Sequence, residues 1–193
     1  MIVLLRHGQT EFNVAGRLQG QLDSPLTEIG RAQALRMGDR LAQLAAGRRV
    51  AIHASPLTRA FDTARIVADR IPGSPEPLVD PGFKEISFGA WDGLTQPEID
   101  ARWPGLRAQV PRHHWFFHGP NGETLDMLMA RIAPALARVA ADPAELRVIV
   151  SHGIAGWVIR MAHTGQTPED TILPGLQQDS LQHLTPDRRV ILL

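Results

Sequence analysis

The chain has no cysteine among its 193 residues, and its only lysine is Lys84. The absence of cysteine excludes disulfide bonds, thiolate zinc sites and a cysteine nucleophile, and therefore the cysteine-dependent phosphatases. A P-loop needs a lysine directly after a glycine, but Lys84 follows Phe83. No G-x-G-x-x-G or G-x-S-x-G segment occurs either. Several common routes to nucleotide binding and covalent catalysis are thus closed to this protein.

The chain also has no excess of charge, because 20 basic residues balance 20 acidic ones. Hydrophobic residues make up 44% and charged residues 21%, which is typical of a globular domain and gives no general affinity for nucleic acid or anionic membrane. Residues 2–5, ahead of Arg6, are too short an apolar run for a signal peptide or a membrane span. We expect one domain over residues 1–193, in the cytoplasm, without nucleic-acid or membrane partners.

Short apolar runs alternate with segments of helical periodicity along the chain. Such alternation predicts a three-layer α/β/α sandwich with a mostly parallel central sheet. The expected buried strands are residues 1–5, 50–54 and 147–151, with short late strands at 181–184 and 190–193. The expected helices are residues 25–46, 57–70, 123–141 (with a kink or break at Pro134) and 154–163.

The pattern also predicts the core face of one helix, a loop and an inserted cap. The helix at 25–46 has apolar residues at helical spacing, which predicts that they face the core: Ile29, Ala32, Leu35, Leu41 and Leu44. Residues 73–82 are rich in proline and glycine and predict a loop. Residues 94–122 contain several prolines and one short helix at most, which predicts a small cap inserted over the core.

Two buried strands end in the same dipeptide, His7-Gly8 and His152-Gly153. A third ends before Ser55 and is followed by Arg59. Either histidine alone could sit in an ordinary strand-to-loop turn. Ligands of open α/β sheets, however, bind at the carboxyl ends of strands, and these strands would bring four side chains together there: His7, His152, Arg6 and Arg59. Two imidazoles and two guanidiniums suit a phosphoryl group with three outer oxygens.

These residues belong to a longer series of motifs. The series resembles the histidine phosphatase superfamily, also called the phosphoglycerate mutase-like family, in the family's order from residue 1 to about 160. The motifs are Arg6-His7-Gly8-Gln9-Thr10 with Asn13, Pro25-Leu26-Thr27-x-x-Gly30, Ser55-Pro56-Leu57-x-Arg59-Ala60, Glu85-x-x-x-Gly89-x-Trp91-x-Gly93, Pro120-Asn121-Gly122-Glu123-Thr124 and Ser151-His152-Gly153.

The resemblance implies a role for each matched residue. His7 is implied to attack phosphorus and form a phosphohistidine, with Glu85 as general acid and then general base. The implied phosphoryl-binding residues are Arg6, Arg59 and His152, and the candidate substrate-binding residues are Asn13, Thr10, Gln19, Gly20 and Gly153. Neither a metal nor a cofactor is implied.

Attack requires the ring of His7 to be neutral, and Arg6 and Arg59 would lower its pKa in that direction. A hydrogen bond from its other nitrogen to a backbone carbonyl would fix the tautomer. Glu85 must carry a proton to act as an acid; burial and a nearby phosphate dianion favour that proton, and the arginines oppose it.

Three functions remain open on the sequence. The first is a metal-independent phosphomonoesterase for a small phosphorylated metabolite. The second is a cofactor-dependent phosphoglycerate mutase, against which the short chain between Glu85 and Glu123 argues, although three arginines are candidates for holding a second charged group: Arg102, Arg107 and Arg112. The third is a non-catalytic binding module on the same fold.

The aromatic cluster at residues 113–118 has no single interpretation. His114 and His118 could bind a metal if they shared a helical face, but nearby prolines argue against a helix. The cluster could instead edge the substrate crevice or pack the insertion, and Trp115, Phe116 and Phe117 would then favour an apolar or aromatic leaving group. The oligomeric state is open, with a homodimer among the options.

Overall fold

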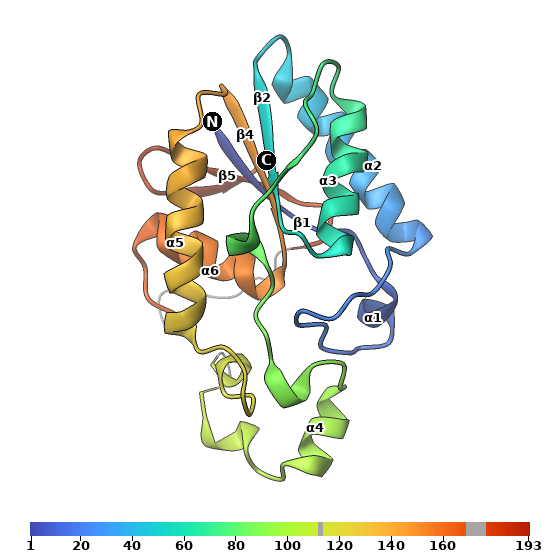
Figure 1. The fold of residues 1–193 in the computed structure, drawn as a ribbon, viewed down its shortest axis with the longest axis vertical. Helices are drawn as coiled ribbons and strands as arrows, with labels where there is room; N and C mark the ends of the chain where they lie inside the picture. Colours follow the sequence, from blue (N-terminus) through green and yellow to red (C-terminus); the bar gives the residue numbers. More distant parts are fainter. Residues whose placement is uncertain (112–113, 169–176) are drawn as a thin grey trace.

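The computed structural model describes residues 1–111, 114–168 and 177–193. Its sheet has the strand order β3-β2-β4-β1-β5-β6 (Figure 1). β1, β2, β3 and β4 run parallel to one another, and β5 and β6 are antiparallel to their neighbours, so the predicted mostly parallel sheet is confirmed. The strands are β1 Ile2–Arg6, β2 Val50–Ala54, β3 Leu78–Val79, β4 Leu146–Ser151, β5 Leu181–Leu184 and β6 Val190–Leu192.

Helices cover both faces of this sheet, α2 and α3 on one side and α5 and α6 on the other (Figure 1). The alternation of β1 explains the two layers. Val3 and Leu5 pack in a core cluster with α2 and α3, whereas Leu4 packs in a second cluster with α5 and α6. The α-helices are α1 Glu11–Val14, α2 Glu28–Ala45, α3 Thr58–Arg70, α4 Gln96–Arg102, α5 Leu125–Ala141 and α6 Gly153–Thr164. None of those in the described residues is both long and apolar enough to cross a bilayer.

The predicted core face of α2 is wrong in part. Ile29 is 59% exposed and Leu35 is 44% exposed, although Leu41 is buried as expected. The buried stripe instead contains small residues, with glycine at 30 and 38. Small residues let the helix backbone approach its neighbours, and Gly38 packs directly on Arg70 and Val67 of α3. Close backbone packing therefore outweighs the burial of the two larger side chains.

Capping residues move the predicted helix starts toward the C-terminus. Thr27 is extended, and its hydroxyl accepts a hydrogen bond from the amide of Gly30 (3.0 Å), so α2 begins at Glu28 rather than at residue 25. Thr124 caps α5 in the same way. α5 then continues through Pro134 without a break.

The segment expected to be only a loop, residues 73–82, contributes more. It contains the short strand β3 and the start of a 3-10 helix at Pro81–Phe83. β3 extends the parallel sheet beside β2, but both of its side chains are exposed, so no hydrophobic pattern marks it.

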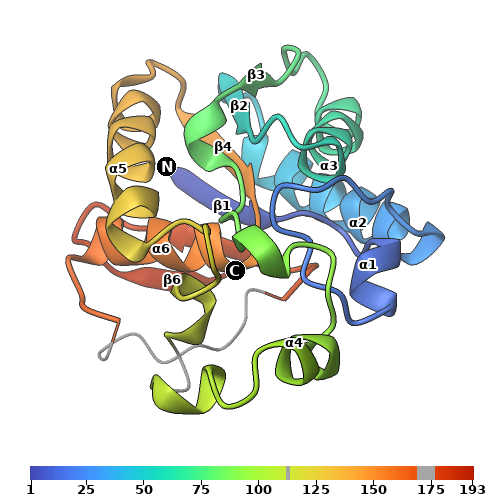
Figure 2. The same ribbon diagram turned by 60° about the horizontal axis from the view of Figure 1, so that its bottom comes forward.

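Residues 94–111 and 114–122 lie beyond the ends of the strands and contain α4 and two 3-10 helices, Arg107–Gln109 and Trp115–Phe117 (Figures 1 and 2). Ile99 and Trp115 are buried and belong to the same core cluster as Trp91. The segment is therefore packed onto the body of the domain through apolar contacts.

The loop after β1 lies against the first turn of α2. An ideal Cβ at Gly8 would be 2.2 Å from the carbonyl oxygen of Gly30, and one at Gly30 would be 2.0 Å from that of Gln9. Both distances are far below van der Waals contact, so the chain can approach this closely only with glycine at both positions.

Replacing Gly30 by alanine tests this contact. Helix propensity alone would favour alanine by about 1 kcal/mol, but overpacking against a backbone costs about 1–3 kcal/mol. We expect a net loss of unfolding free energy in urea denaturation. Gln43→Ala, an exposed site on the same helix, should change stability by less than about 0.5 kcal/mol. A Gly30→Ala protein as stable as the wild type would contradict the close approach.

Candidate active site

His7 follows β1 directly, and its amide continues the ladder to β4 by donating to the carbonyl of Ser151 (3.0 Å). The ring is 2% exposed, and its Nδ1 lies 2.7 Å from the carbonyl oxygen of Gly8. In the neutral ring that bond requires the proton on Nδ1, which leaves the lone pair on Nε2. Burial, followed by the charges of Arg59 and Arg6, holds the pKa of His7 well below 6.5. The ring is therefore uncharged, with a tautomer that leaves Nε2 unprotonated.

Arg59 lies in the first turn of α3 and is fully buried. Its Nη1 and Nη2 donate to the carbonyls of Leu22 and Gly20, both at 2.7 Å. Burial is the main cause that lowers its pKa, to about 10, so the group stays charged at neutral pH. Its Nε is buried and has no hydrogen-bond partner among the described residues. Arg59 thus both fixes the loop at residues 20–22 and keeps one buried donor unused.

His152 lies at the end of β4, with its ring centroid 5.1 Å from that of His7. Its Nε2 is 2.8 Å from the hydroxyl of Ser55, which follows β2. That hydroxyl also accepts from the amide of Leu57. When the hydroxyl donates its own proton to Nε2, the histidine proton sits on Nδ1. This Nδ1 is buried and has no partner among the described residues. Burial, together with the charges of Arg59, His7 and Arg6, lowers the pKa of His152.

Glu85 is 7% exposed and faces the N-terminus of α6. Its Oε1 accepts from the amides of Ile86 (3.0 Å) and Ala155 (2.8 Å), and its Oε2 accepts from the amide of Ile154 (3.2 Å). Two of these donors belong to the first turn of α6, where backbone N–H groups have no helical partner. Oε1 therefore has both lone pairs engaged, and Oε2 retains one for a proton.

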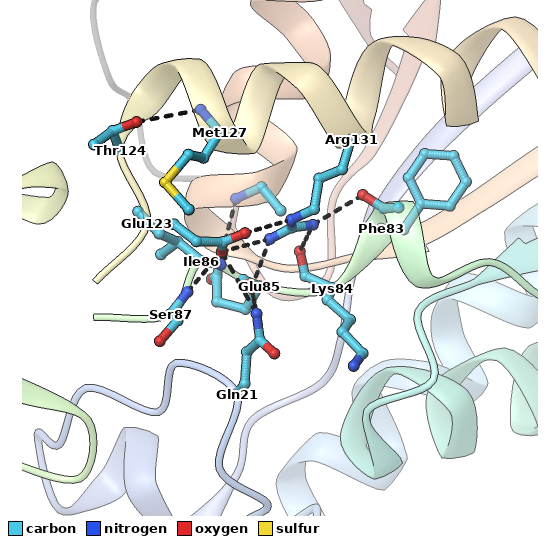
Figure 3. A network of polar contacts seen from close by, with 12 residues as sticks. Gln21, Phe83, Lys84, Glu85, Ile86, Ser87, Glu123, Thr124, Met127 and Arg131 are labelled. Atoms are coloured by element: carbon cyan, nitrogen blue, oxygen red, sulfur yellow. Dashed lines mark hydrogen bonds and ion pairs between the residues drawn. The ribbon is translucent and has the colours of Figure 1, made fainter. Parts of the chain in front are cut away.

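The backbone around Glu85 is fixed by a partly buried ion pair between Arg131 of α5 and Glu123 (Figure 3). The guanidinium of Arg131 also donates to the carbonyls of Gly82 (2.9 Å), Lys84 (2.7 Å) and Glu85 (2.8 Å). Glu123 in turn accepts from the amide of Ser87 at 2.8 Å. Residues on both sides of Glu85 are thus tied to α5. Arg131 is not among the residues expected from the sequence. The sequence feature that could have indicated its role is a single arginine within an otherwise apolar stretch of α5.

These groups meet in a cleft of about 270 Å³. Four of the lining residues are apolar and form what we call the apolar wall: Leu18, Phe88, Phe116 and Ile154. The polar lining residues are Arg6, His7, Asn13, Arg17, Gln19, Gly20, Arg59, Glu85 and Gly153. The cleft therefore includes nearly all of the residues expected from the sequence, and Arg17 and the apolar wall are additions.

Two of the expected residues are placed differently. Thr10 is fully buried and does not line the cleft, because its hydroxyl caps α1 through the amide of Asn13 (3.2 Å) and also donates to Gln19 (3.0 Å). His152 is not among the residues that line the cleft, but its ring lies beside that of His7.

The aromatic cluster contributes one residue to the cleft. Phe116 lines it, whereas Trp115 is buried beside Arg107, and Phe117 stacks on Trp157 with ring centroids 5.8 Å apart. The remaining member, His113, lies outside the described residues. His114 and His118 flank a 3-10 turn and do not share a helical face, and the described residues contain no group of three or more metal-ligating side chains.

The family motif at residues 120–124 has asparagine where a glycine is frequent. Asn121 has φ 61°, in the left-handed region that asparagine tolerates better than most residues. The turn packs so closely on Gly89 that a Cβ there would lie 2.2 Å from the carbonyl oxygen of Pro120. The departure from glycine therefore leaves this turn intact.

Known proteins resemble the chain along most of its length. Glucosyl-3-phosphoglycerate phosphatase from Mycobacterium tuberculosis is 38% identical over 164 residues, covering 79% of this chain and 70% of that protein. Metal-independent phosphoserine phosphatase from Arabidopsis thaliana is 38% identical over 160 residues, covering 79% and 63%. A 2,3-bisphosphoglycerate-dependent phosphoglycerate mutase from a Methylobacterium species is 33% identical over 184 residues, covering 92% and 86%.

The fold matches as well as the sequence does. The structure of the mycobacterial glucosyl-3-phosphoglycerate phosphatase in complex with VO3 superimposes with a TM-score of 0.79 at 32% identity, covering 94% of this chain and 90% of that one. The model of the histidine phosphatase superfamily (branch 1) matches residues 2–191. The resemblance predicted from the ordered motifs is confirmed, and the chain belongs to the histidine phosphatase superfamily, branch 1.

Proposed function

We propose that this protein is a metal-independent phosphomonoesterase that hydrolyses a small phosphorylated metabolite through a phosphohistidine at His7. The main support is the state of His7, a neutral imidazole whose Nδ1 is bonded to the carbonyl of Gly8 and whose Nε2 is free for attack. Relatives named as phosphatases, one of them a metal-independent phosphoserine phosphatase, favour the same reaction class.

In the first step, Nε2 of His7 attacks phosphorus, a P–N bond forms and the P–O bond to the leaving group breaks. Glu85 gives its proton, held on Oε2, to the departing oxygen. In the second step, Glu85 takes a proton from water, which attacks phosphorus and breaks the P–N bond. Phosphate leaves, and His7 returns to its neutral form with no external reactant other than water.

The phosphoryl oxygens need hydrogen-bond donors beside His7, and two buried groups have unused ones. Nε of Arg59 and Nδ1 of His152 both lack partners in the described part of the chain. Arg6 and Asn13 line the cleft together with His7 and add donors and charge. Donors that are already fixed and desolvated stabilise the charge of the transition state without reorganising.

A phosphoglycerate mutase is the second candidate, because a mutase relative aligns with 92% of the chain. A mutase must retain a second charged group near the site. Two of the three arginines suggested for this do not supply it: Arg107 pairs with Asp100 and packs on Trp115, and Arg102 is exposed and does not line the cleft. Arg112 lies outside the described residues. The apolar wall of the cleft favours hydrolysis of an ester with an uncharged leaving group.

Residues 94–122 act in this proposal as a cap, since they bring Phe116 to the cleft. The cytoplasmic location and the homodimer stay predictions, and size-exclusion chromatography with light scattering would determine the oligomeric state. A non-catalytic binding module would show no turnover across a broad panel of phosphoesters.

Substitution of the two central residues tests the mechanism. His7→Ala should reduce turnover at least about 10³-fold and abolish the acid-labile phosphoprotein formed with ³²P-labelled substrate, because no nucleophile remains. Glu85→Gln should slow turnover about 10²–10⁴-fold and leave phosphate binding intact. His118→Ala, an exposed histidine away from the cleft, is the control. Normal turnover by His7→Ala would refute the assignment.

The arginine beside the nucleophile should control its pH range. After burial, Arg59 is the largest cause of the low pKa of His7. In Arg59→Met that pKa should rise toward the ordinary value of about 6.5, so protonated, inactive His7 accumulates as the pH falls. The ratio of kcat/KM for the variant to that for the wild type cancels substrate ionisation. It should decrease between about pH 8 and pH 5.5, and a constant ratio would contradict this origin of the low pKa.

The apolar wall should select the leaving group. Removing the ring of Phe116 exposes apolar surface, a loss of about 1–3 kcal/mol, so Phe116→Ala should lower kcat/KM for naphthyl phosphate about 5- to 100-fold relative to phosphoserine. Phe61→Ala, on α3 and outside the cleft, is the matched control. Equal effects on both substrates would show that Phe116 does not contact the leaving group.

A further inference from the structure

A second cavity lies between the C-terminal turn of α6 and the turn of the β5–β6 hairpin, and its described lining residues are all different from those of the cleft. Its volume is about 340 Å³, within the range of small-molecule sites. Three of the lining residues carry a guanidinium and none carries a carboxylate. The described lining residues are Arg160, Thr164, Gln166, Arg188, Arg189 and Val190.

Arg160 is the unusual member of this set. It is 6% exposed, yet its Nε and Nη2 are buried without any hydrogen-bond partner, and it forms no ion pair within the described residues. Burial is the only cause found for the lowering of its pKa, so no counter-charge faces it there. A buried guanidinium without partners is strongly unfavourable. Such a group is explained when a ligand completes its hydrogen bonds.

The hairpin supplies the opposite wall. Arg188 has φ 61°, and its amide donates to the carbonyl of Thr185 (3.0 Å). Residue 188 therefore lies in the turn between β5 and β6. Its Nη1 lies 3.7 Å from the position of a Cβ at Gly165, the residue that ends α6. Arg189 is partly neutralised by Asp187, with Nε 2.6 Å from the carboxylate, but that pair is exposed. Within the part of the chain that the structure describes, neither Arg160 nor Arg188 forms an ion pair, and they lie on either side of the cavity.

We propose that this cavity is a second binding site, for a small metabolite that carries a phosphate or several carboxylates, with Arg160 at its base and Arg188 and Arg189 at its rim. The planar guanidinium fork matches the oxygens of both anions in a bidentate manner. The site is separate from the cleft, and its existence does not depend on the proposed phosphatase activity.

Isothermal titration calorimetry of the full chain, with inorganic phosphate and with citrate as probes, tests the proposal. The wild type should bind phosphate at the cavity in addition to any binding at the cleft. Arg160→Met keeps the apolar stem and should lose the cavity site, and Arg188→Gln should weaken it at least about tenfold. The exposed Arg102→Met is the matched control and should bind as the wild type does. Binding of citrate alone would assign the site to polycarboxylates.

A stability measurement separates ligand binding from a structural role of Arg160. In a chloride buffer free of these anions, Arg160→Met should have a Tm equal to or above that of the wild type, because an unpartnered buried charge is removed. A lower Tm would overturn the proposal, as would equal anion binding by the wild type and both site variants, or binding by none. If Arg160→Met does not fold, Arg188→Gln decides by calorimetry. If the phosphatase proposal fails and the cleft binds no phosphate, calorimetry of the wild type should still detect one phosphate site, the cavity. Arg160→Met should then show no site.

Discussion

Five residue pairs hold β1 against β4 in parallel register, from Ile2 opposite Arg147 to Arg6 opposite Ser151. This register brings His7 and His152 to the same edge of the sheet, one residue past each strand. A shift by one residue would turn the side chains of β1 to the opposite faces and separate the two imidazoles. The apolar residues of β1 prevent that shift, because Val3 and Leu5 fit the layer of α2 and α3 while Leu4 fits the layer of α5 and α6.

The electrostatics of the cleft follow from this placement. Burial keeps His7 uncharged, and the neighbouring guanidiniums reinforce that state. Arg59 stays charged in the interior because two backbone carbonyls of the loop at residues 20–22 accept its hydrogen bonds. Glu85 lies at the first turn of α6. Backbone amides of that turn hold its carboxylate, and the guanidinium of Arg131 holds its backbone carbonyl. Helix ends and loop carbonyls thus position each ionisable group while the cleft stays open.

The sequence predicts most of this arrangement. An apolar run that stops at a histidine indicates a buried strand, and the histidine indicates that a candidate site lies at the carboxyl end of that strand. Its errors have local physical causes. Ile29 was expected in the core, but backbone contact through glycines turns the other face of α2 inward. Thr10 lies within a motif, yet its hydroxyl serves as a helix cap. Arg131 could not be recognised because three of its partners are backbone carbonyls 46 to 49 positions away, which no local pattern encodes.

The central strand has a further consequence for how the protein forms in the cell. β1 is made first, but both of its neighbours in the sheet, β4 and β5, come from the last quarter of the chain. Contacts so distant in sequence close slowly, and a growing chain can form the β2–α3 region before β1 has any partner. The edge of the sheet that carries His7 and His152 can therefore form only when synthesis is nearly complete. Until then the apolar residues of β1 lack a sheet partner, and we expect chaperones that bind newly made apolar segments to bind them.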